Sequence, residues 1–383
     1  MELNGTIKIG VFGGAFDPIH SEHVHLVKQA IEQLGLTRVL VVPSFHAPHK
    51  LTSTSYQDRV AMAELAFADV PEVEISLIES EIEGNTYSAV VLPKLAEKVG
   101  GFVHLVGGDS LLAIESWYRP QEVLRYPVAV FARGDQRDRL VEFAAHLEDK
   151  FGAQVMVLQS EGEPISSTDI RLSLAVGRRP QGLADSVYSY ITAHGLYAPY
   201  ARIVQDVSSR LDARRWAHTQ EVALFAAKLA PKLGLPLDKV LPAALLHDCA
   251  KTADGGKQYE YLCKAIPSFC RQAAVLHAFQ GALVAEEKYG ITDPDVLNAI
   301  RYHTTGRAGM SDLERLIYLA DYAEPTRTHE GSAEVRALSL ADFEQGFRLA
   351  VDNTFRHIRN QADLCPLGEE CHRFYIKQGE QND

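Results

Sequence analysis

The chain has 383 residues, of which 46% are hydrophobic and 23% charged, and its formal net charge is −12. This length suffices for two domains of ordinary globular composition, and the acidic balance argues against broad nucleic-acid binding, which needs a basic surface. No apolar run approaches the roughly 18 residues of a membrane helix, and residues 1–4 show no signal sequence, so we expect a cytoplasmic protein that binds neither nucleic acid nor membranes.

The first half of the chain alternates between short apolar runs and longer helical patterns. Strands are expected at 7–12, 38–42, 73–78, 102–106, 128–132 and 154–158, and helices at 20–34, 57–68, 88–99, 137–150, 167–176 and 185–194. This alternation predicts an α/β domain with a doubly wound parallel sheet, which binds ligands at the carboxyl ends of its strands. We place this domain at residues 1–200.

A candidate phosphate site follows the first strand. Gly13 and Gly14 lead into a helix, and a strand, a glycine turn and a helix N-terminus form an anion site from backbone N–H groups. His20 and His23 are three residues apart and share one face of the first helical turn. There they could donate to the phosphates of a triphosphate and stabilise the transferred phosphoryl group. The alternative is a capping histidine and a surface histidine.

A second phosphate-binding segment is Ile165-Ser-Ser-Thr-Asp-Ile-Arg171. Serine and threonine at a helix start cap the helix and present N–H and hydroxyl donors. Arg171 can reach a phosphate with two N–H groups. Taken alone, the segment would be read as a plain helix cap with a solvated arginine.

The second half shows no strand alternation and is predicted to be an all-α domain, residues 201–383. Residues 204–214 are expected to be a helical linker or first helix, and further helices are expected at 216–230, 238–247, 271–288, 295–303, 312–321 and 340–359. The polar tail, 363–383, is expected to be frayed.

The five cysteines lack the spacing of a disulfide framework and are expected to stay reduced. Two of them, Cys365 and Cys371, stand near His372 in the tail. These three residues could suggest a zinc site, but three potential ligands in a tail are more often incidental.

The apolar, helix-like segments of the second half carry a set of candidate metal ligands, and the anchor is the adjacent His-Asp pair. Charged aspartates in such segments are costly unless they are paired or metal-bound. Four imidazoles and two carboxylates suit iron or manganese rather than a tetrahedral structural zinc. The alternative is a group of independent structural residues. The set is His218, His247, Asp248, His277, His303 and Asp321.

The first half resembles the bacterial nicotinate-mononucleotide adenylyltransferases over about residues 7–197, with the Rossmann-like fold of that superfamily. The resemblance rests on Gly13-Gly-Ala-Phe-Asp-Pro-Ile-His-Ser-Glu-His23 and on the 165–171 segment. Between them lie Pro43-Ser-Phe-His-Ala-Pro-His-Lys50, Asp58-Arg59, Thr86-Tyr-Ser88, Val106-Gly-Gly-Asp-Ser110 and Trp117. Glu22 stands where the family has glycine, and Ala15 where it often has threonine or serine.

The resemblance implies adenylyl transfer from ATP, assisted by Mg²⁺, to nicotinate mononucleotide. The implied ATP-binding residues are Gly13, Gly14, Phe16, His20, His23, Ser166, Ser167, Thr168 and Arg171. The mononucleotide would be held by Lys50, Thr86, Tyr87 and Trp117, with Asp109 near the cleft, and Gly107 and Arg133 complete the implied set. The alternative is a domain that binds nucleotides without turnover, because Glu22 adds bulk and charge where glycine permits close approach.

The second half resembles the HD-domain symmetrical diadenosine tetraphosphate hydrolases, a di-iron subgroup, over about residues 205–362. The resemblance rests on the ligand order, on Tyr302-His-Thr-Thr-Gly306 and on Leu319-Ala-Asp-Tyr-Ala-Glu-Pro-Thr-Arg327. It implies hydrolysis of diadenosine tetraphosphate to two ADP, with Lys251, Thr305 and Arg307 at the substrate. The alternative for Arg307 is a solvated loop arginine, and the alternative for the domain is another nucleotide substrate.

Six ligands are too many for one ion that must keep positions open, so we expect two ions, iron first and manganese as the alternative. His218, His247 and Asp321 would hold one ion. His277 and His303 would hold the other, and Asp248 would touch both. Water activated by the ions would attack the phosphorus. The sequence thus predicts a bifunctional enzyme and leaves homo-oligomer formation open.

Overall fold

A computed structural model describes residues 7–45, 52–133, 136–160, 162–252, 257–359 and 365–377. The chain divides into two compact units: residues 1–171 with 180–197 form the first, and residues 172–179 with 198–383 form the second. The domain boundary expected near residue 200 stays a prediction. Among the described residues, no helix is both long and apolar enough to cross a membrane.

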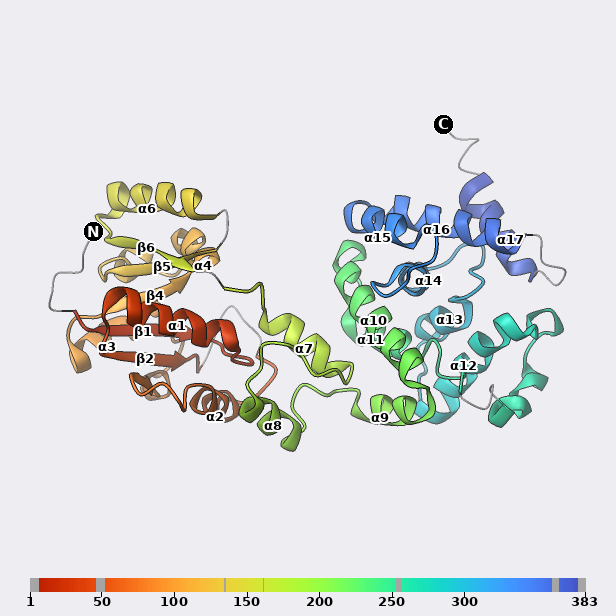
Figure 1. The fold of residues 1–383 in the computed structure, drawn as a ribbon, viewed down its shortest axis with the longest axis horizontal. Coiled ribbons are helices and arrows are strands. Elements are labelled where there is room, and N and C mark those ends of the chain that lie inside the picture. Colours follow the sequence, from red (N-terminus) through yellow and green to blue (C-terminus); the bar gives the residue numbers. More distant parts are fainter. Residues whose placement is uncertain are drawn as a thin grey trace. The chain divides into compact units, whose positions relative to one another are not determined.

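The first unit is built on one parallel sheet in the order β3-β2-β1-β4-β5-β6 (Figure 1). This confirms the expected doubly wound sheet. The order reverses between β1 and β4, the two neighbours around which a doubly wound sheet places its ligand crevice. The strands are β1 (Ile9–Gly14), β2 (Arg38–Pro43), β3 (Val73–Ile75), β4 (Val103–Gly107), β5 (Val128–Arg133) and β6 (Val155–Ser160).

Helices alternate with these strands as the sequence predicts. On one face of the sheet, Leu40 and Val106 pack in the same buried cluster as Val91 and Leu95 of helix α3 (Ser88–Val99). The third strand is shorter than expected because a 3-10 turn, η1 (Ile78–Glu81), follows it. The other elements are α1 (Ser21–Leu34), α2 (Tyr56–Ala66), α3 (Ser88–Val99), α4 (Gly108–Leu112), η2 (Ile114–Ser116), α5 (Pro120–Val123), α6 (Arg137–Phe151), α7 (Ser167–Ala175) and α8 (Asp185–Ala193).

The described part of the second unit is helical throughout, which confirms the predicted all-α domain (Figure 1). Its helices are α9 (Ala201–Arg210), α10 (Ala213–Leu229), α11 (Leu237–Leu246), α12 (Ala273–Tyr289), α13 (Pro294–Tyr302), α14 (Asp312–Ala323), α15 (Ser332–Ala341), α16 (Phe343–Ile358) and α17 (Pro366–His372), with shorter turns η4 (Ala230–Leu233), η5 (Lys257–Ala265), η6 (Ser268–Cys270) and η7 (Arg373–Lys377).

The expected single helix over residues 340–359 is two helices. Asp342 separates α15 from α16 with an extended backbone, and its side chain accepts a hydrogen bond from the backbone N–H of Gln345. A carboxylate that caps a helix start in this way favours a new helix over continuation of the old one.

Helix α11 forms the centre of the second unit's core. Every residue from Val240 to Leu246 is buried, as expected for a helix that is apolar on all sides. The helix ends directly before His247 and Asp248, and both of these polar side chains are therefore buried in the interior of the second unit.

The tail was expected to be frayed, but its described part, residues 365–377, is folded. Cys371 and His372 of α17 are buried, and the His372 Nε2 lies 3.0 Å from Asp352 Oδ1 of α16. Cys371 joins the main apolar core, and Cys365 lies in a separate small cluster with Cys270. Burial of Cys365, Cys371 and His372 thus orders a segment whose composition is largely polar.

Candidate functional site

The turn after β1 places two histidines at the start of α1. His20 is the N-cap of α1 and is buried, and its ring lies 3.8 Å from that of His23, centroid to centroid. The backbone N–H of His20 donates to His23 Nδ1 over 3.2 Å. Because Nδ1 accepts, the neutral His23 ring carries its proton on Nε2 and can donate there. His20 therefore caps α1, as the alternative interpretation expected, but its ring also packs against that of His23.

Close packing leaves no room for a side chain at one of the two glycines of this turn. A Cβ on Gly14 would meet the Phe16 ring at 2.9 Å, and Phe16 itself adopts a φ of +50°. Gly13 pairs with Val42 of β2 at the end of the strand. The turn therefore brings backbone groups to the carboxyl end of β1, where phosphate binding was predicted.

The two predicted phosphate-binding segments lie together. An Arg171 Nη1–H donates to the Asp17 carbonyl over 2.6 Å, and the Ser167 hydroxyl donates to the Pro18 carbonyl over 2.9 Å. The Ser166 hydroxyl accepts from the backbone N–H of Asp169, which caps α7 as expected. Arg171 also donates to the Thr168 hydroxyl, 3.2 Å away.

Sequence analysis assigned no role to the Asp17 carboxylate. It accepts hydrogen bonds from the backbone N–H of Ser53 at 2.6 Å and from the hydroxyls of Thr54 and Tyr197, both at 2.7 Å. These bonds fix the loop between β1 and α1. The sequence signal that could have revealed this role is the Asp17-Pro18 pair in the turn after the first strand.

Glu22, at the position of the family glycine, turns to the segment after β6. It is 4% exposed, and its Oε1 accepts from the backbone N–H of Glu163 over 3.0 Å. A Cβ on Gly162 would lie 2.0 Å from Glu22 Oε2. The absence of a side chain at residue 162 thus makes room for the bulk that Glu22 adds.

The residues predicted to hold the mononucleotide form contacts of their own. Thr86 is buried and its side chain bonds to Glu79, while Tyr87 packs on Tyr118 with ring centroids 4.7 Å apart. The Trp117 ring lies edge-on to His104 at 6.5 Å.

The remaining predicted residues are more scattered. Gly107 ends β4 and is the N-cap of α4, and Asp109 is exposed in the first turn of that helix. Arg133 ends β5, opposite Ser160. Lys50 lies outside the described residues.

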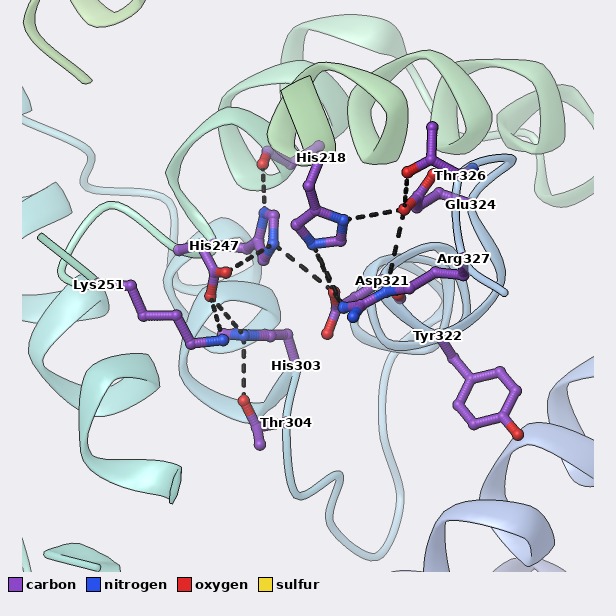
Figure 2. A network of polar contacts seen from close by, with 12 residues as sticks. His218, His247, Lys251, His303, Thr304, Asp321, Tyr322, Glu324, Thr326 and Arg327 are labelled. Atoms are coloured by element: carbon purple, nitrogen blue, oxygen red, sulfur yellow. Dashed lines mark hydrogen bonds and ion pairs between the residues drawn. The ribbon is translucent and has the colours of Figure 1, made fainter. Parts of the chain in front are cut away.

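In the second unit, five helices bring all six candidate metal ligands together, as Figure 2 shows for most of them. The histidine rings follow one another at centroid distances of 5.0 to 5.5 Å. The ligands come from the interior or ends of their helices: His218 from α10, His247 and Asp248 after α11, His277 from α12, His303 after α13 and Asp321 from α14.

One end of the set centres on Asp321. Its Oδ1 lies 2.9 Å from His218 Nε2 and 3.8 Å from His247 Nε2. Ligand atoms of these three residues lie within 4.8 Å of one another. They could hold one ion together.

The other end centres on Asp248. Its Oδ1 lies 3.4 Å from both His277 Nε2 and His303 Nε2, which are 3.3 Å apart. Its Oδ2 lies 3.7 Å from His247 Nε2. The two carboxylate oxygens of Asp248 therefore face the two ends of the set.

Backbone carbonyls orient two of the rings. His247 Nδ1 donates to the Ala244 carbonyl and His303 Nδ1 to the Ile300 carbonyl, both over 2.7 Å. A carbonyl only accepts, so the proton is on Nδ1 and the Nε2 lone pair points into the set. This is the usual arrangement of a metal-binding histidine.

Burial keeps two imidazoles neutral. It lowers the pKa of His247 to about 4, and together with nearby Lys251 it lowers the pKa of His277 well below the ordinary value. A neutral imidazole is the form that binds metal.

The charged groups balance at the Asp321 end. Burial disfavours the charged forms, but hydrogen bonds to Asp321 and Glu324 raise the pKa of His218 to about 9. Burial raises the pKa of the Asp248 and Asp321 carboxyl groups, but the surrounding imidazoles outweigh it and hold both pKa values well below the ordinary value. Both carboxyl groups are therefore ionised, as metal ligands must be.

Two buried atoms indicate that the set fits a metal centre. His247 Nε2 and Asp248 Oδ1 have no hydrogen bond of acceptable geometry, although the residues are 0% and 2% exposed. Leaving such atoms without hydrogen bonds is costly. Nitrogen and carboxylate donors suit divalent first-row metals, and an ion would satisfy both atoms.

Three residues around the set were not predicted. Glu324 is 1% exposed and its Oε1 lies 3.1 Å from His218 Nδ1. The Thr304 hydroxyl lies 3.2 Å from His277 Nε2, and Arg327 donates to Asp321 Oδ1 over 2.7 Å. Glu324 and Arg327 lie in the quoted 319–327 motif, which was the available signal.

The three residues predicted to contact the substrate differ in their surroundings. The Lys251 ammonium lies 3.1 Å from Asp248 Oδ1 and so stands at the set. Arg307 instead donates twice to the buried carboxylate of Glu314, over 2.9 and 2.7 Å. The Thr305 hydroxyl donates to the Gly306 carbonyl within its own loop.

A nucleotidyltransferase-like α/β unit followed by a helical His-Asp metal centre defines the class of this protein. Residues 11–173 match the cytidylyltransferase-like family, and residues 215–326 match the HD domain family, which implies that this domain binds a divalent metal. The chain belongs to the nicotinate-nucleotide adenylyltransferase/Ap4A hydrolase family, as its relatives show.

Three relatives cover the two halves and the whole. A probable nicotinate-nucleotide adenylyltransferase of Solibacter usitatus is 37% identical over 198 residues, 50% of this chain and 100% of the relative. A symmetrical bis(5'-nucleosyl)-tetraphosphatase of Bacillus subtilis is 36% identical over 39% of this chain and 81% of the relative. A probable nicotinate-nucleotide adenylyltransferase/Ap4A hydrolase of Mycoplasma pneumoniae is 28% identical over 91% of this chain and 98% of the relative.

Proposed function

We propose that this protein is a bifunctional enzyme whose two domains, residues 1–200 and 201–383, carry separate activities. The first transfers AMP from ATP to nicotinate mononucleotide, giving deamido-NAD and pyrophosphate. The second hydrolyses diadenosine tetraphosphate to two ADP. The observation that carries the proposal is the cluster of six buried or half-buried candidate ligands, in a chain whose relatives combine the same two activities by name.

In the first reaction, a phosphate oxygen of the mononucleotide bonds to the α-phosphorus of ATP, and the bond to the β-phosphate oxygen breaks. His23 would donate from Nε2 to phosphate oxygens, next to the backbone N–H groups at the start of α1. Arg171 and Ser167 would hold the triphosphate from α7, whose start is tied to the same loop. Mg²⁺ would accompany ATP.

In the second reaction, a water oxygen bonds to a phosphorus of the tetraphosphate, and the bridging bond to the departing ADP breaks. Two divalent ions, iron or alternatively manganese, would supply Lewis acidity and lower the pKa of water. His218, His247 and Asp321 would hold one ion. His277 and His303 would hold the other, with Asp248 between them. Lys251 would bind a phosphate oxygen beside Asp248.

The test is an assay of the purified full chain, with metal analysis of the same preparation. We expect deamido-NAD from ATP and nicotinate mononucleotide, two ADP from diadenosine tetraphosphate, and two ions per chain. A fully active hydrolase with one ion, or ATP plus AMP as products, would contradict the two-metal symmetrical reaction.

The binding-only alternative for the first domain has its own signature. It requires tight ATP binding without turnover, with activity appearing in Glu22→Gly. The contact of Glu22 with the backbone of Glu163 speaks for an active domain, because its carboxylate already has a partner in the segment after β6. If a mononucleotide or a guanosine nucleotide were hydrolysed and diadenosine tetraphosphate were not, the substrate assignment would be wrong.

A further inference from the structure

Arg327 is the cationic side chain at the Asp321 end of the ligand set. Its Nε donates to the Asp321 carbonyl over 3.0 Å and its Nη2 to Asp321 Oδ1 over 2.7 Å, and Nη2 lies 3.4 Å from His218 Nε2. The Arg327 side chain is 37% exposed, against 17% and 14% for Asp321 and His218. Arg327 is therefore the part of this cluster that solvent, and so a dissolved substrate, reaches most easily.

A bound ion would disfavour the present position of the Arg327 Nη2. An ion held by Asp321 Oδ1 and His218 Nε2 would lie about 2 Å from each atom. The same two atoms are the nearest neighbours of the Arg327 Nη2. The charge of the ion repels the nearby guanidinium, and the lone pair of His218 Nε2 is then used by the ion, so we expect Nη2 to turn away from the set.

The backbone contact keeps the guanidinium near the centre after this change. The bond from Arg327 Nε goes to the Asp321 carbonyl and not to its carboxylate. The planar guanidinium can then rotate so that Nη1 and Nη2 turn toward solvent, while Nε stays close to the Asp321 carbonyl. Its released N–H groups form the planar donor pair that binds phosphate oxygens in two places.

We propose that Arg327 binds the phosphate group next to the one held by the ions, and so selects substrates that carry a chain of phosphates. The inference rests on the proposed hydrolase function. Lys251 lies at the Asp248 end of the set and Arg327 at the Asp321 end, and Figure 2 shows Arg327 beside Asp321. A polyphosphate chain that crosses the ions would meet a cation at each end.

The structure favours Arg327 over Arg307 for this role. Both N–H contacts of Arg307 go to Glu314, whose side chain is 1% exposed. Pulling Arg307 away would leave that buried carboxylate unpaired, which is costly. Releasing Nη2 of Arg327 leaves no such charge, because the ion replaces it on Asp321.

The test uses the full chain loaded with Co²⁺, whose visible absorption reports ligands at this centre alone. The wild type, Arg327→Gln and Arg327→Lys are titrated with ADP and with orthophosphate, after metal content is measured. In Arg327→Gln we expect wild-type metal content, about tenfold weaker ADP binding, the loss of one charged hydrogen-bond pair, and orthophosphate affinity within about twofold of wild type. Arg327→Lys should recover part of the ADP affinity.

Arg348→Gln is the matched control, because Arg348 is also an exposed arginine paired with a carboxylate, Glu344 of α16. It should bind ADP as the wild type does. Loss of metal from Arg327→Gln, or ADP affinity unchanged at full metal content, would overturn the proposal. If the wild type binds ADP through Arg327 but does not hydrolyse diadenosine tetraphosphate, only the proposed function fails.

Discussion

At the scale of single residues, the candidate metal centre depends on the groups that contact the Nδ1 atoms of its histidines, on the side of each ring that faces away from the centre. His247 and His303 each donate Nδ1 to a carbonyl of the preceding helix turn, so their orientation follows from local helix geometry. His218 has no such carbonyl. Its Nδ1 faces Glu324, a buried carboxylate whose own oxygens accept from the backbone N–H and the hydroxyl of Thr326.

We therefore expect Glu324→Gln to weaken metal retention. The amide cannot supply the negative charge that makes His218 a stronger ligand, and losses of such partners typically cost about 10- to 100-fold in metal affinity. The measurement is metal content per chain after dialysis against a graded chelator. Thr326→Val should show a smaller loss, because the backbone bond to Glu324 remains. Equal retention by wild type and Glu324→Gln would contradict the prediction.

His104 of β4 makes the stability of the first unit dependent on pH. It is 5% exposed, and burial lowers its pKa from 6.5 to about 4. As pH falls below the ordinary value, the unfolded chain takes up a proton and the folded chain does not, so stability is lost from about pH 6.5 to pH 4. Between pH 7 and pH 5 this amounts to about 2 kcal/mol.

The check is the urea midpoint of the first unit in the full chain at pH 7 and pH 5. His104→Leu should lose less stability over this interval than the wild type does, because it lacks the group that titrates. If both chains shift by the same amount, other groups cause the pH dependence.

At the scale of elements, the turn between α13 and α14 joins the metal centre to the tail. Gly306 has a φ of +63°, and a Cβ there would meet Cys371 Sγ at 2.5 Å. His303, three residues earlier, is a candidate ligand. The packing of α17 therefore depends on the absence of a side chain in a turn that also ends the ligand-bearing segment.

Gly306→Ala should destabilise the second unit by about 1–3 kcal/mol, because alanine is strained at positive φ and its methyl group displaces Cys371. The thermal midpoint of the second transition is the measurement. Gly290→Ala is the matched control, since it has a φ of +70° and nothing within 4 Å of its Cβ. A Gly306→Ala effect no larger than the control would show that contact with α17 is unimportant.

At the scale of the whole molecule, helix α7 belongs to both units. Arg171 contacts the turn after β1, whereas Ala175 and Val176 are buried in the core of the second unit. A chain cut at residue 200 would expose these apolar side chains. Tests of independent activities are therefore best made with single substitutions in the full chain.

We expect Asp248→Ala to lose its ions and its hydrolase activity, while adenylyl transfer stays within about twofold of wild type. His20→Asn should do the reverse: asparagine can still cap α1, but loss of the imidazole should reduce adenylyl transfer about 100-fold. Both activities and the metal content are measured on each preparation. Loss of both activities in either variant would show that the two sites are not independent.

The sequence alone was sufficient to predict the α/β and all-α halves, because short apolar runs, the 3.6-residue period of helices and the glycine turns are local properties of the chain. It also identified the candidate ligands, because four histidines and two aspartates lie within or at the end of apolar, helix-like segments, in an order that resembles the HD-domain hydrolases. The adjacent His-Asp pair would not have been sufficient without the other four residues.

Only the tertiary structure decided which partners those side chains meet. Glu324 and Glu314 are both buried glutamates at or near the ends of α14, and although Glu324 lies in the 319–327 motif, the sequence does not show that it faces His218 or that Glu314 pairs with Arg307. The folded tail was missed for the same reason, because α17 is stabilised by packing against Gly306 and not by its own composition. Burial and pairing between distant segments are set by how the helices pack, and that information is not contained in any single segment.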